Sequence, residues 1–214
     1  MLQSEKTVKK DRRQPSQERS KKRVDAILNA AKTLISEKGS AQLKVHEIAS
    51  RAGVTAASIY QYFPSKDAIT HALAEQTFDR VHQQIQSELP EVTSLDDAFA
   101  VLREQVEGYY QLYLADPALY DVWVAISADK RVQDLDLQDS RRTAMLVVAC
   151  LQPFYPEKLA PSLSRVGFLL AHLSGAAVRM AVSVGEEEGR VVVNSFKAML
   201  SPPFVESMLN AEEA

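Results

Sequence analysis

Apolar side chains recur at intervals of three and four residues along most of the chain, which is the spacing of amphipathic α-helices. The stretch 23–39 is a clear example, with Ile27, Ala31 and Leu34 on one side. Neither a β-hairpin signal nor an internal repeat stands out. The pattern therefore predicts an all-α fold of about nine helices.

Prolines and capping residues divide the rest of the chain into elements. Ser65 and the acidic Asp67 predict the start of a long helix that Pro90 ends. The further helices that we expect cover about 94–115, a short segment after Pro117, 141–151, 162–184 and 191–209, the last interrupted by Pro202 and Pro203. The polar stretch 130–140, which contains Asp134, Asp136 and Asp139, is expected to be a loop.

Residues 43–66 predict two short helices joined at a glycine. The first runs from about Val45 to Ala52, and Gly53 suits the tight turn because glycine accepts a positive φ without a Cβ clash. Thr55 can cap the second helix, which we expect to end at Phe63. This is the form of a helix-turn-helix, whose second helix lies in the major groove of DNA.

The second helix of this pair has two different faces. Ile59 and Phe63 point inward at a spacing of four residues, while the outward positions are Ala56, Ala57, Ser58, Tyr60, Gln61 and Tyr62. No outward residue is acidic, so this face can approach a polyanion closely. An ordinary helical hairpin with aromatic core residues is the alternative.

The surrounding pattern distinguishes these alternatives. A helix precedes the pair, a long helix follows it, and the characteristic residues are Ala30-Ala31, Leu34, Gly39, Ile48-Ala49, Ala52-Gly53-Val54, Ile59-Tyr60, Tyr62-Phe63 and Lys66. Over about residues 23–70 this resembles the tetracycline-repressor (TetR) family of bacterial transcription regulators. One departure is Lys44, which stands where the family usually has a threonine or serine cap and cannot accept backbone N–H bonds.

The resemblance implies an N-terminal three-helix helix-turn-helix DNA-binding domain and a C-terminal helical ligand-binding and dimerisation domain. In the family the last two long helices pair with their symmetry mates, which here are about 162–184 and 191–209. A two-fold dimer also reads two half-sites of a palindromic operator, whereas one helix contacts few bases. A single domain that covers both faces of the helix at 162–184 is the alternative.

The predicted DNA contacts come from the helix-turn-helix and its neighbours. Gln61 can bond a base edge, Ser58 and Thr55 a base or phosphate, and Ala56 or Ala57 can contact a thymine methyl group. The residues expected to grip phosphates are Lys44, Tyr60, Tyr62 and Lys66.

The resemblance also implies a small inducer bound between the central helices. The residues expected to line its pocket are Val106, Tyr109, Tyr110, Tyr113, Trp123, Met145, Phe168 and His172. No Arg or Lys belongs to this set, so we expect a hydrophobic or aromatic ligand. Plain core packing is the alternative for each aromatic residue.

Charge is distributed unevenly along the 214 residues. Residues 1–70 carry 14 Lys and Arg against 7 Asp and Glu, whereas residues 71–214 carry 11 against 21. A basic head on an acidic body suits a nucleic-acid-binding domain joined to a different one. We expect a disordered basic arm at 1–22, a DNA-binding domain at 23–68 and a helical ligand-binding and dimerisation domain at 69–214.

Other chemistry is not indicated by the sequence. No P-loop, nucleotide-binding glycine motif or hydrolase motif occurs, so we expect no enzyme activity and no cofactor. His71, Glu75, Asp79 and His82 share a helical stripe, for which a solvated face is preferred over a metal site. Cys150 has apolar neighbours and suits a buried structural thiol in a cytoplasmic protein. No secretory signal or membrane span is predicted.

The sequence therefore predicts a homodimeric DNA-binding transcription regulator, a repressor that a small ligand releases from its operator. Two alternatives remain open. One is a constitutive or partner-controlled DNA-binding regulator without an inducer. The other is a helical small-molecule-binding protein or enzyme whose N-terminal helices are only scaffold.

Overall fold

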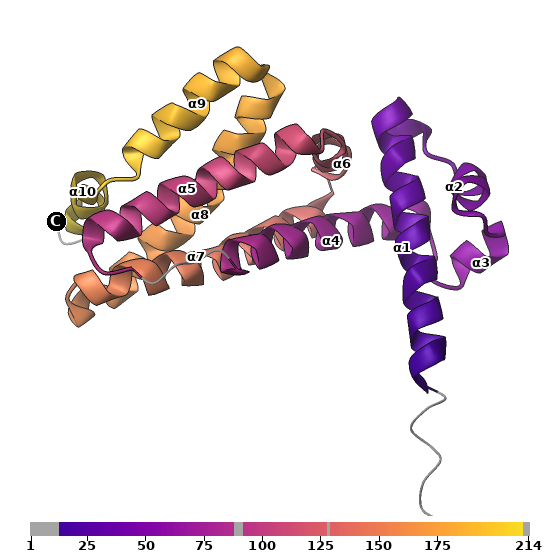
Figure 1. The fold of residues 1–214 in the computed structure, drawn as a ribbon, viewed down its shortest axis with the longest axis horizontal. Coiled ribbons are helices and arrows are strands. Elements are labelled where there is room, and N and C mark those ends of the chain that lie inside the picture. Colours follow the sequence, from indigo (N-terminus) through magenta and orange to yellow (C-terminus); the bar gives the residue numbers. More distant parts are fainter. Residues whose placement is uncertain (1–12, 88–91, 128, 212–214) are drawn as a thin grey trace, which may run out of the picture. The chain divides into compact units, whose positions relative to one another are not determined.

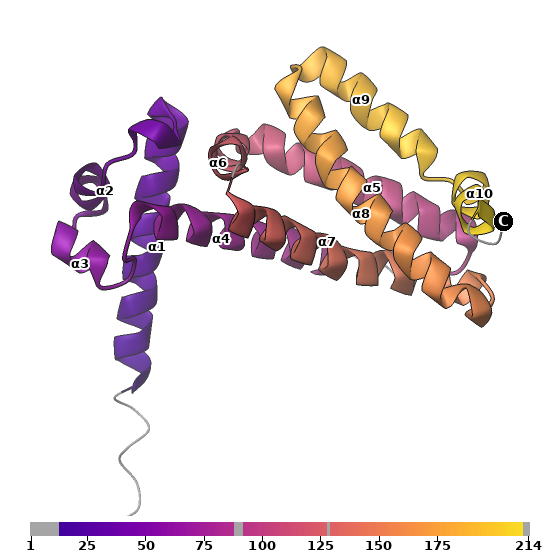
Figure 2. The same cartoon turned by 180° about the vertical axis from the view of Figure 1, so that it is seen from behind.

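The computed structural model describes residues 13–87, 92–127 and 129–211 and contains ten α-helices and no strand over these residues. It divides into two compact units, Met1–Leu73 and Ala74–Ala214. Figures 1 and 2 show the helices from opposite sides. The prediction of an all-α fold is confirmed.

The first unit contains three helices and the start of a fourth. They are α1 (Arg13–Lys38), α2 (Val45–Ala52), α3 (Ala56–Tyr60) and the beginning of α4 (Lys66–Ser87), with a 3-10 turn at Ser40–Gln42 between α1 and α2. Their core consists of the fully buried side chains Ile27, Ile35, Ile48, Ile59 and Ile69. Each helix contributes at least one of these side chains, so small helices that are marginal alone stabilise one another.

Two boundaries in this unit differ from the predictions. α1 begins at Arg13, so residues 13–22 are helical and not a disordered arm; residues 1–12 lie outside the described residues. α3 ends at Tyr60 and not at Phe63, because the N–H groups of both Tyr62 and Phe63 bond the Ile59 carbonyl. A turn therefore ends the helix three residues earlier than the apolar spacing suggests.

The second unit is built around one long helix. Its elements are the remainder of α4, α5 (Leu95–Ala115), α6 (Ala118–Ile126), α7 (Lys130–Leu151), α8 (Ala160–Ser183), α9 (Glu186–Met199) and α10 (Pro202–Ala211), with 3-10 turns at Gln152–Phe154 and Glu157–Leu159. α8 packs against α7 and α9 and also contacts α5 (Figure 2). The core between them includes Phe99, Tyr110, Leu163 and Val178.

Two segments of this unit correct the sequence predictions, and a third agrees with the predicted interruption at Pro202. Residues 130–140 are the first half of α7 and not a loop, because Asp129 caps the helix by accepting the Arg131 N–H at 2.9 Å. Glu186 begins α9, where acidic side chains suit the positive end of the helix dipole. Pro202 starts a separate helix, since proline is well tolerated in a first turn.

Two glycines set the approach of α9 to α8. Gly185 has φ 91°, which turns the chain between the helices. At Gly189 a Cβ atom would lie 2.2 Å from the Ala181 carbonyl oxygen, so a side chain has no room there. The two helices pack closely because this position is glycine.

One helical stretch among the described residues, Glu157–Ser183, is long and apolar enough to cross a membrane by length and composition alone. The inner side of this stretch belongs to the core of the unit. Of its most apolar 18-residue segment, 39% is buried. Helices at the centre of water-soluble domains share this composition. The remaining apolar surface of this helix faces outward.

Candidate DNA-binding and ligand-binding sites

The turn between α2 and α3 is fixed by Gly53. This residue has φ 66° in the left-handed region, and its N–H bonds the carbonyl of Ser50 at 3.3 Å. The next N–H, from Val54, bonds the carbonyl of Ala49 at 3.0 Å. These two bonds close the end of α2 and direct the chain into the next helix.

α3 begins at a side-chain cap and rests on buried apolar residues. The Thr55 hydroxyl accepts the Ser58 N–H at 3.1 Å, which satisfies a backbone donor at the start of the helix. Ile59 and Phe63 anchor the inner side, with exposed fractions of 0% and 7%. This anchoring leaves the opposite side of the short helix to solvent.

All nine residues predicted to contact DNA lie at the surface or are partly exposed. The exposed ones are Lys44, Thr55, Ala57, Tyr60 and Gln61, and the partly exposed ones are Ala56, Ser58, Tyr62 and Lys66. Among the described residues of this unit, Tyr60 is the most exposed large hydrophobic side chain, at 55%. Lys44 occupies the N-cap position of α2 and makes no side-chain cap hydrogen bond, so its ammonium group does not serve the helix end.

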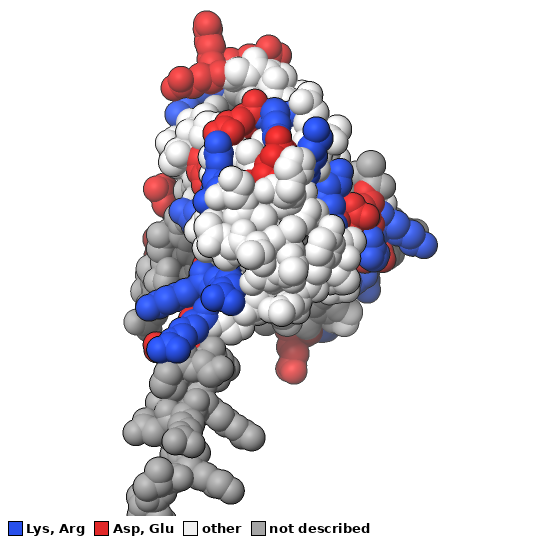
Figure 3. Space-filling model, turned by 90° about the vertical axis from the view of Figure 1, so that its right-hand side faces the viewer, with Lys and Arg blue, Asp and Glu red and all other residues white. Residues whose placement is uncertain are grey.

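Charged groups surround this surface. Figure 3 shows an area without charged side chains that is bordered by Lys and Arg, with some acidic groups among them. Two acidic side chains of this unit form ion pairs, Glu47 with Lys38 and Glu37 with Arg51, the latter at 2.6 Å. The hydrogen bond from Lys38 lowers the pKa of Glu47. The arrangement suits close approach to a polyanion.

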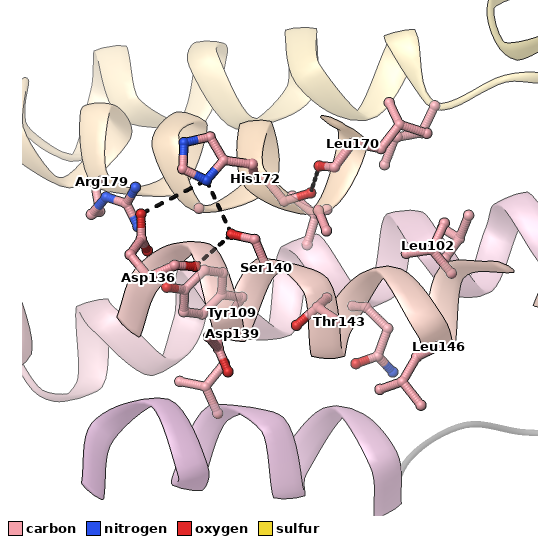
Figure 4. Close-up of a pocket in the computed structure, with 18 residues that line it drawn as sticks. Leu102, Tyr109, Asp136, Asp139, Ser140, Thr143, Leu146, Leu170, His172 and Arg179 are labelled. Carbon is pink, nitrogen blue, oxygen red and sulfur yellow. Dashed lines mark hydrogen bonds and ion pairs between the residues drawn. The ribbon is translucent and has the colours of Figure 1, made fainter. Parts of the chain in front are cut away.

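A cavity of about 70 Å³ lies within the second unit, between α4, α5, α7 and α8. Figure 4 shows its two ends. Leu102, Leu146 and Leu170 lie at one end, Thr143 lies between the ends, and the polar groups gathered at the other end are Tyr109, Asp136, Asp139, Ser140, His172 and Arg179. Val81, Gln105, Val106 and Val147 also line the cavity. The cavity is therefore amphipathic.

Asp136 is the centre of the polar end. It lies 3.5 Å from the Arg179 guanidinium and 3.8 Å from Nδ1 of His172. Ser140 donates to the backbone carbonyl of Asp136 at 2.8 Å and lies 3.0 Å from the same His172 nitrogen. Because serine and aspartate meet one imidazole nitrogen, they cannot form the relay of a hydrolase, which needs the two opposite nitrogens.

Arg179 also contacts Trp123, which lies outside the cavity lining. Its guanidinium carbon stands 4.0 Å from the centre of the Trp123 ring on α6, and Trp123 in turn meets Phe78 of α4 edge to face at 6.2 Å. A cation held over an indole ring is attracted by the ring electrons. The arginine is thus restrained by one carboxylate and one aromatic ring.

Asp139 differs from Asp136 in its surroundings. Burial raises the pKa of this carboxyl group to about 6, against the opposing effect of the nearby Arg142. Its Oδ1 atom is buried and receives no hydrogen bond from any residue that the structure describes. A buried acidic oxygen of this kind is costly to ionise without a partner.

Of the eight residues predicted to line the pocket, Val106, Tyr109 and His172 do so. Tyr110 and Tyr113 belong to the core, and Trp123 stands behind Arg179. The two others lie elsewhere: Phe168 packs under Arg141 at 4.5 Å, and Met145 is 66% exposed on the outer side of α7. These five placements differ from the prediction.

Three charged residues of the lining, Asp136, Asp139 and Arg179, are absent from the predicted set. The sequence predicts a loop for both aspartates, and no local pattern pairs them with an arginine on a distant helix. The expectation of a pocket without Arg or Lys is therefore wrong. Asp129 is the sequence signal for this helix, because an aspartate at that position can cap it. A helix that begins there places residues 136, 139 and 140 on one face.

Comparison with known proteins gives matches to both units. The model "Bacterial regulatory proteins, tetR family" matches residues 27–73. The model "Tetracyclin repressor-like, C-terminal domain" matches residues 96–202, half of the chain. The chain belongs to the tetR family. The predicted resemblance is confirmed, and it extends from the helix-turn-helix to the cavity-bearing unit.

Similar regulators match this tetR-family chain over a limited part of their length. An uncharacterized HTH-type transcriptional regulator of Mycobacterium tuberculosis is 31% identical over 77 residues, 36% of this chain and 38% of that protein. The uncharacterized HTH-type regulator YvdT of Bacillus subtilis is 36% identical over 67 residues, 31% of this chain and 34% of its own. The chain thus spans little more than a third of these relatives.

Solved structures extend the likeness in fold. The transcriptional regulator FadR of Bacillus subtilis, in complex with stearoyl-CoA, has a TM-score of 0.64 and 19% identity, covering 83% of this chain and 97% of its own. A regulator from Mesorhizobium loti has a TM-score of 0.62 and 19% identity, covering 90% and 98%. At such identity the likeness concerns the fold alone.

Proposed function

We propose that this protein is a homodimeric, DNA-binding transcription regulator of the cytoplasm, a repressor that a small ligand releases from a palindromic operator. The observation that carries the proposal is the exposed, uncharged face of α3 on a capped helix-turn-helix, bordered by Lys and Arg (Figure 3). Membership of the tetR family supports the same function.

α3 inserts into the major groove in this proposal. Gln61, Ser58 and Thr55 contact bases or the adjoining phosphates, while Ala56 and Ala57 contact thymine methyl groups. The flanking phosphates are held by Lys44, Tyr60, Tyr62 and Lys66. Phosphate contacts set the position and orientation of the helix, and base contacts supply the sequence preference.

The dimer forms through the outer faces of α8 and α9. Large apolar side chains stand exposed there, namely Leu169, Met180, Val184, Val191 and Met199, between 36% and 61% open. Covering such a surface with a second copy of itself stabilises the pair through the hydrophobic effect. The two-fold axis then presents two α3 helices to half-sites about 34–36 Å apart or a multiple of this distance.

The ligand binds in the cavity of the second unit. It releases DNA by favouring a dimer state whose two α3 helices no longer match the half-site spacing, which requires a differential affinity of about 1–3 kcal/mol. Support comes from the FadR neighbour, which was crystallised with stearoyl-CoA and shares this fold. The closed packing of Ser140 and Asp136 on one His172 nitrogen favours binding over catalysis.

The test is binding to the intergenic DNA beside its own gene, measured by electrophoretic shift between 50 and 200 mM salt. We expect retention of a discrete fragment and an affinity that falls steeply with salt, by about 10³-fold if six or more phosphates are neutralised. The absence of binding at the lower salt concentration, or an affinity independent of salt, would contradict the proposal.

A further inference from the structure

The charges at the polar end of the cavity do not balance. Asp136 is matched by Arg179 at 3.5 Å, and Arg179 is also held over Trp123 at 4.0 Å. Asp139 lines the same cavity with its buried Oδ1 atom, which no described residue supplies with a hydrogen bond. The cavity therefore contains one acidic group more than its paired cation neutralises.

Arg142, whose charge acts on Asp139, and His172, which lines the same cavity, contact other residues. Arg142 donates to Asp79 of α4 at 2.8 Å, and His172 directs Nδ1 towards Ser140 and Asp136. With a pKa of about 6, Asp139 is mostly ionised at neutral pH. A buried carboxylate oxygen without a hydrogen-bond donor is costly, and a cation or strong donor placed beside it removes that cost.

The opposite end of the cavity is mainly apolar, and Thr143 lies between it and the polar end. Leu102, Leu146 and Leu170 converge there from α5, α7 and α8 (Figure 4). A ligand that fills the whole cavity must therefore combine a polar head with a hydrocarbon body. A carboxylate head would meet Asp136 and Asp139, whereas an ammonium head would meet an unpaired acceptor.

We infer that the cavity binds a small amphiphilic ammonium compound, whose protonated amine contacts Asp139 Oδ1 and whose apolar body lies along Leu102, Leu146 and Leu170. This inference rests on the proposed ligand-responsive function and names its ligand class. It replaces the expectation of an uncharged hydrophobic or aromatic ligand. Val106 and Tyr109 form the adjoining wall on α5.

Three probes with one body and different heads test this inference. 4-Phenylbutylamine, 4-phenylbutan-1-ol and 4-phenylbutanoate are cationic, neutral and anionic at pH 7.5. Calorimetric titration into the full-length protein should show that the amine binds at least about tenfold tighter than the alcohol, with the acid weakest. A tenfold difference corresponds to about 1.4 kcal/mol.

Variants of α7 assign the preference to one side chain. Asp139→Asn should remove the preference for the amine while leaving alcohol binding within about twofold, and Asp139→Glu, which keeps the charge, should retain it. Asp134→Asn is the matched control, because Asp134 is exposed on the same helix and outside the cavity lining. Circular dichroism checks that each variant is folded. If Asp139→Asn does not fold, the titrations of the wild-type protein and Asp139→Glu decide whether the cavity prefers the amine.

The inference would be overturned if the three probes bound with equal affinity or if the acid bound tightest. It would also be overturned if folded Asp139→Asn kept the preference for the amine. Failure of the folded wild-type protein to bind the amine at millimolar concentration would overturn it as well. DNA binding is measured on the same preparation without probe. Protein that binds DNA but not the amine contradicts the ligand class alone, whereas protein that binds no DNA contradicts the proposed function.

Discussion

The helix-turn-helix and the cavity use polar groups in opposite ways. In the first unit the candidate contacts lie within residues 44–66 on one open surface, and the acids Glu37 and Glu47 are neutralised in pairs at its margin. In the second unit the polar groups converge inward from α5, α7 and α8, and the Oδ1 atom of Asp139 receives no hydrogen bond from the part of the chain that the structure describes. The first arrangement suits an extended polyanion, and the second suits one small cationic head.

The two regions also depend differently on packing. The outward face of α3 needs only a turn, a cap and two buried anchors, Ile59 and Phe63. The cavity is lined mainly by α4, α5, α7 and α8, so it depends on the packing of α8 against its neighbours α5, α7 and α9. Changes that disturb long-range packing should therefore damage the second region and spare the first.

The largest expected effect comes from Gly189→Ala. The new Cβ atom would lie 2.2 Å from the Ala181 carbonyl oxygen, so α9 must move away from α8. We expect the free energy of unfolding of the second unit to fall by about 2–4 kcal/mol. Hydrogen exchange should show lost protection in α8 and α9 with α2 and α3 unchanged.

Gly108→Ala is the control for this substitution. Gly108 lies within α5, and a Cβ atom there meets nothing within 4 Å. Alanine in an open helix position should leave the protein equally stable or raise its stability by about 0.5–1 kcal/mol. Equal losses of stability from the two substitutions would contradict the steric explanation.

Asp139→Asn should change how the stability of the second unit depends on pH. The pKa of Asp139 rises to about 6 in the folded state from an ordinary value of 3.8, so ionisation disfavours folding. Wild-type stability should consequently decrease between about pH 4 and pH 6, by the order of 1–3 kcal/mol, and the variant should lack this decrease. Denaturant unfolding at a series of pH values measures it, and an identical profile in both proteins would contradict the burial of an unpaired carboxyl group.

Glu107→Gln probes the opposite electrostatic arrangement, a paired acid. Glu107 accepts from Arg190 at 2.6 Å and Lys197 at 2.9 Å, both on α9, and also from Gln111. The hydrogen bond from Gln111 and those two cations lower its pKa to about 2. This stabilisation is present above about pH 4.5 and is lost as the pH falls towards 2. Near neutral pH the variant should therefore be less stable by about 1 kcal/mol and show a weaker acid dependence.

Thr55→Ala tests the local character of the first region. Removing the hydroxyl leaves the Ser58 N–H without its 3.1 Å partner at the start of α3. A lost helix cap costs about 1 kcal/mol, and here it should weaken DNA binding without changing ligand affinity. Reduced amine binding in this variant would show that the two regions are less independent than their packing indicates.

This contrast explains how much was predictable from the sequence. The helix-turn-helix and its outward residues follow from interactions between residues close in sequence. These are the turn at Gly53, the cap at Thr55 and the buried pair Ile59 and Phe63. The end of α3 was placed too late because apolar spacing continues through the turn after Tyr60. Local chemistry therefore identifies this region well, apart from its boundary.

The cavity shows where such rules stop. Arg179 meets Asp136 across 43 positions of sequence, and no local pattern pairs them. Met145 and Phe168 have the apolar character of pocket residues but lie outside the lining, because the rotation of α7 and α8 about their axes decides which side chains face inward. The position of the cavity between the central helices was predictable from the family resemblance. Its charged lining was not, because that lining depends on how the helices pack.

The most direct test of the account is the effect of Gln61→Ala on two DNA affinities, measured by fluorescence anisotropy with the operator and with a shuffled duplex of equal length. Gln61 is exposed at the end of α3, and its loss removes a base contact while the phosphate contacts remain. We predict that operator affinity falls by about 1–3 kcal/mol and that affinity for the shuffled duplex is unchanged. Equal losses on both duplexes, or no loss on either, would contradict the claim that this face of α3 reads DNA sequence.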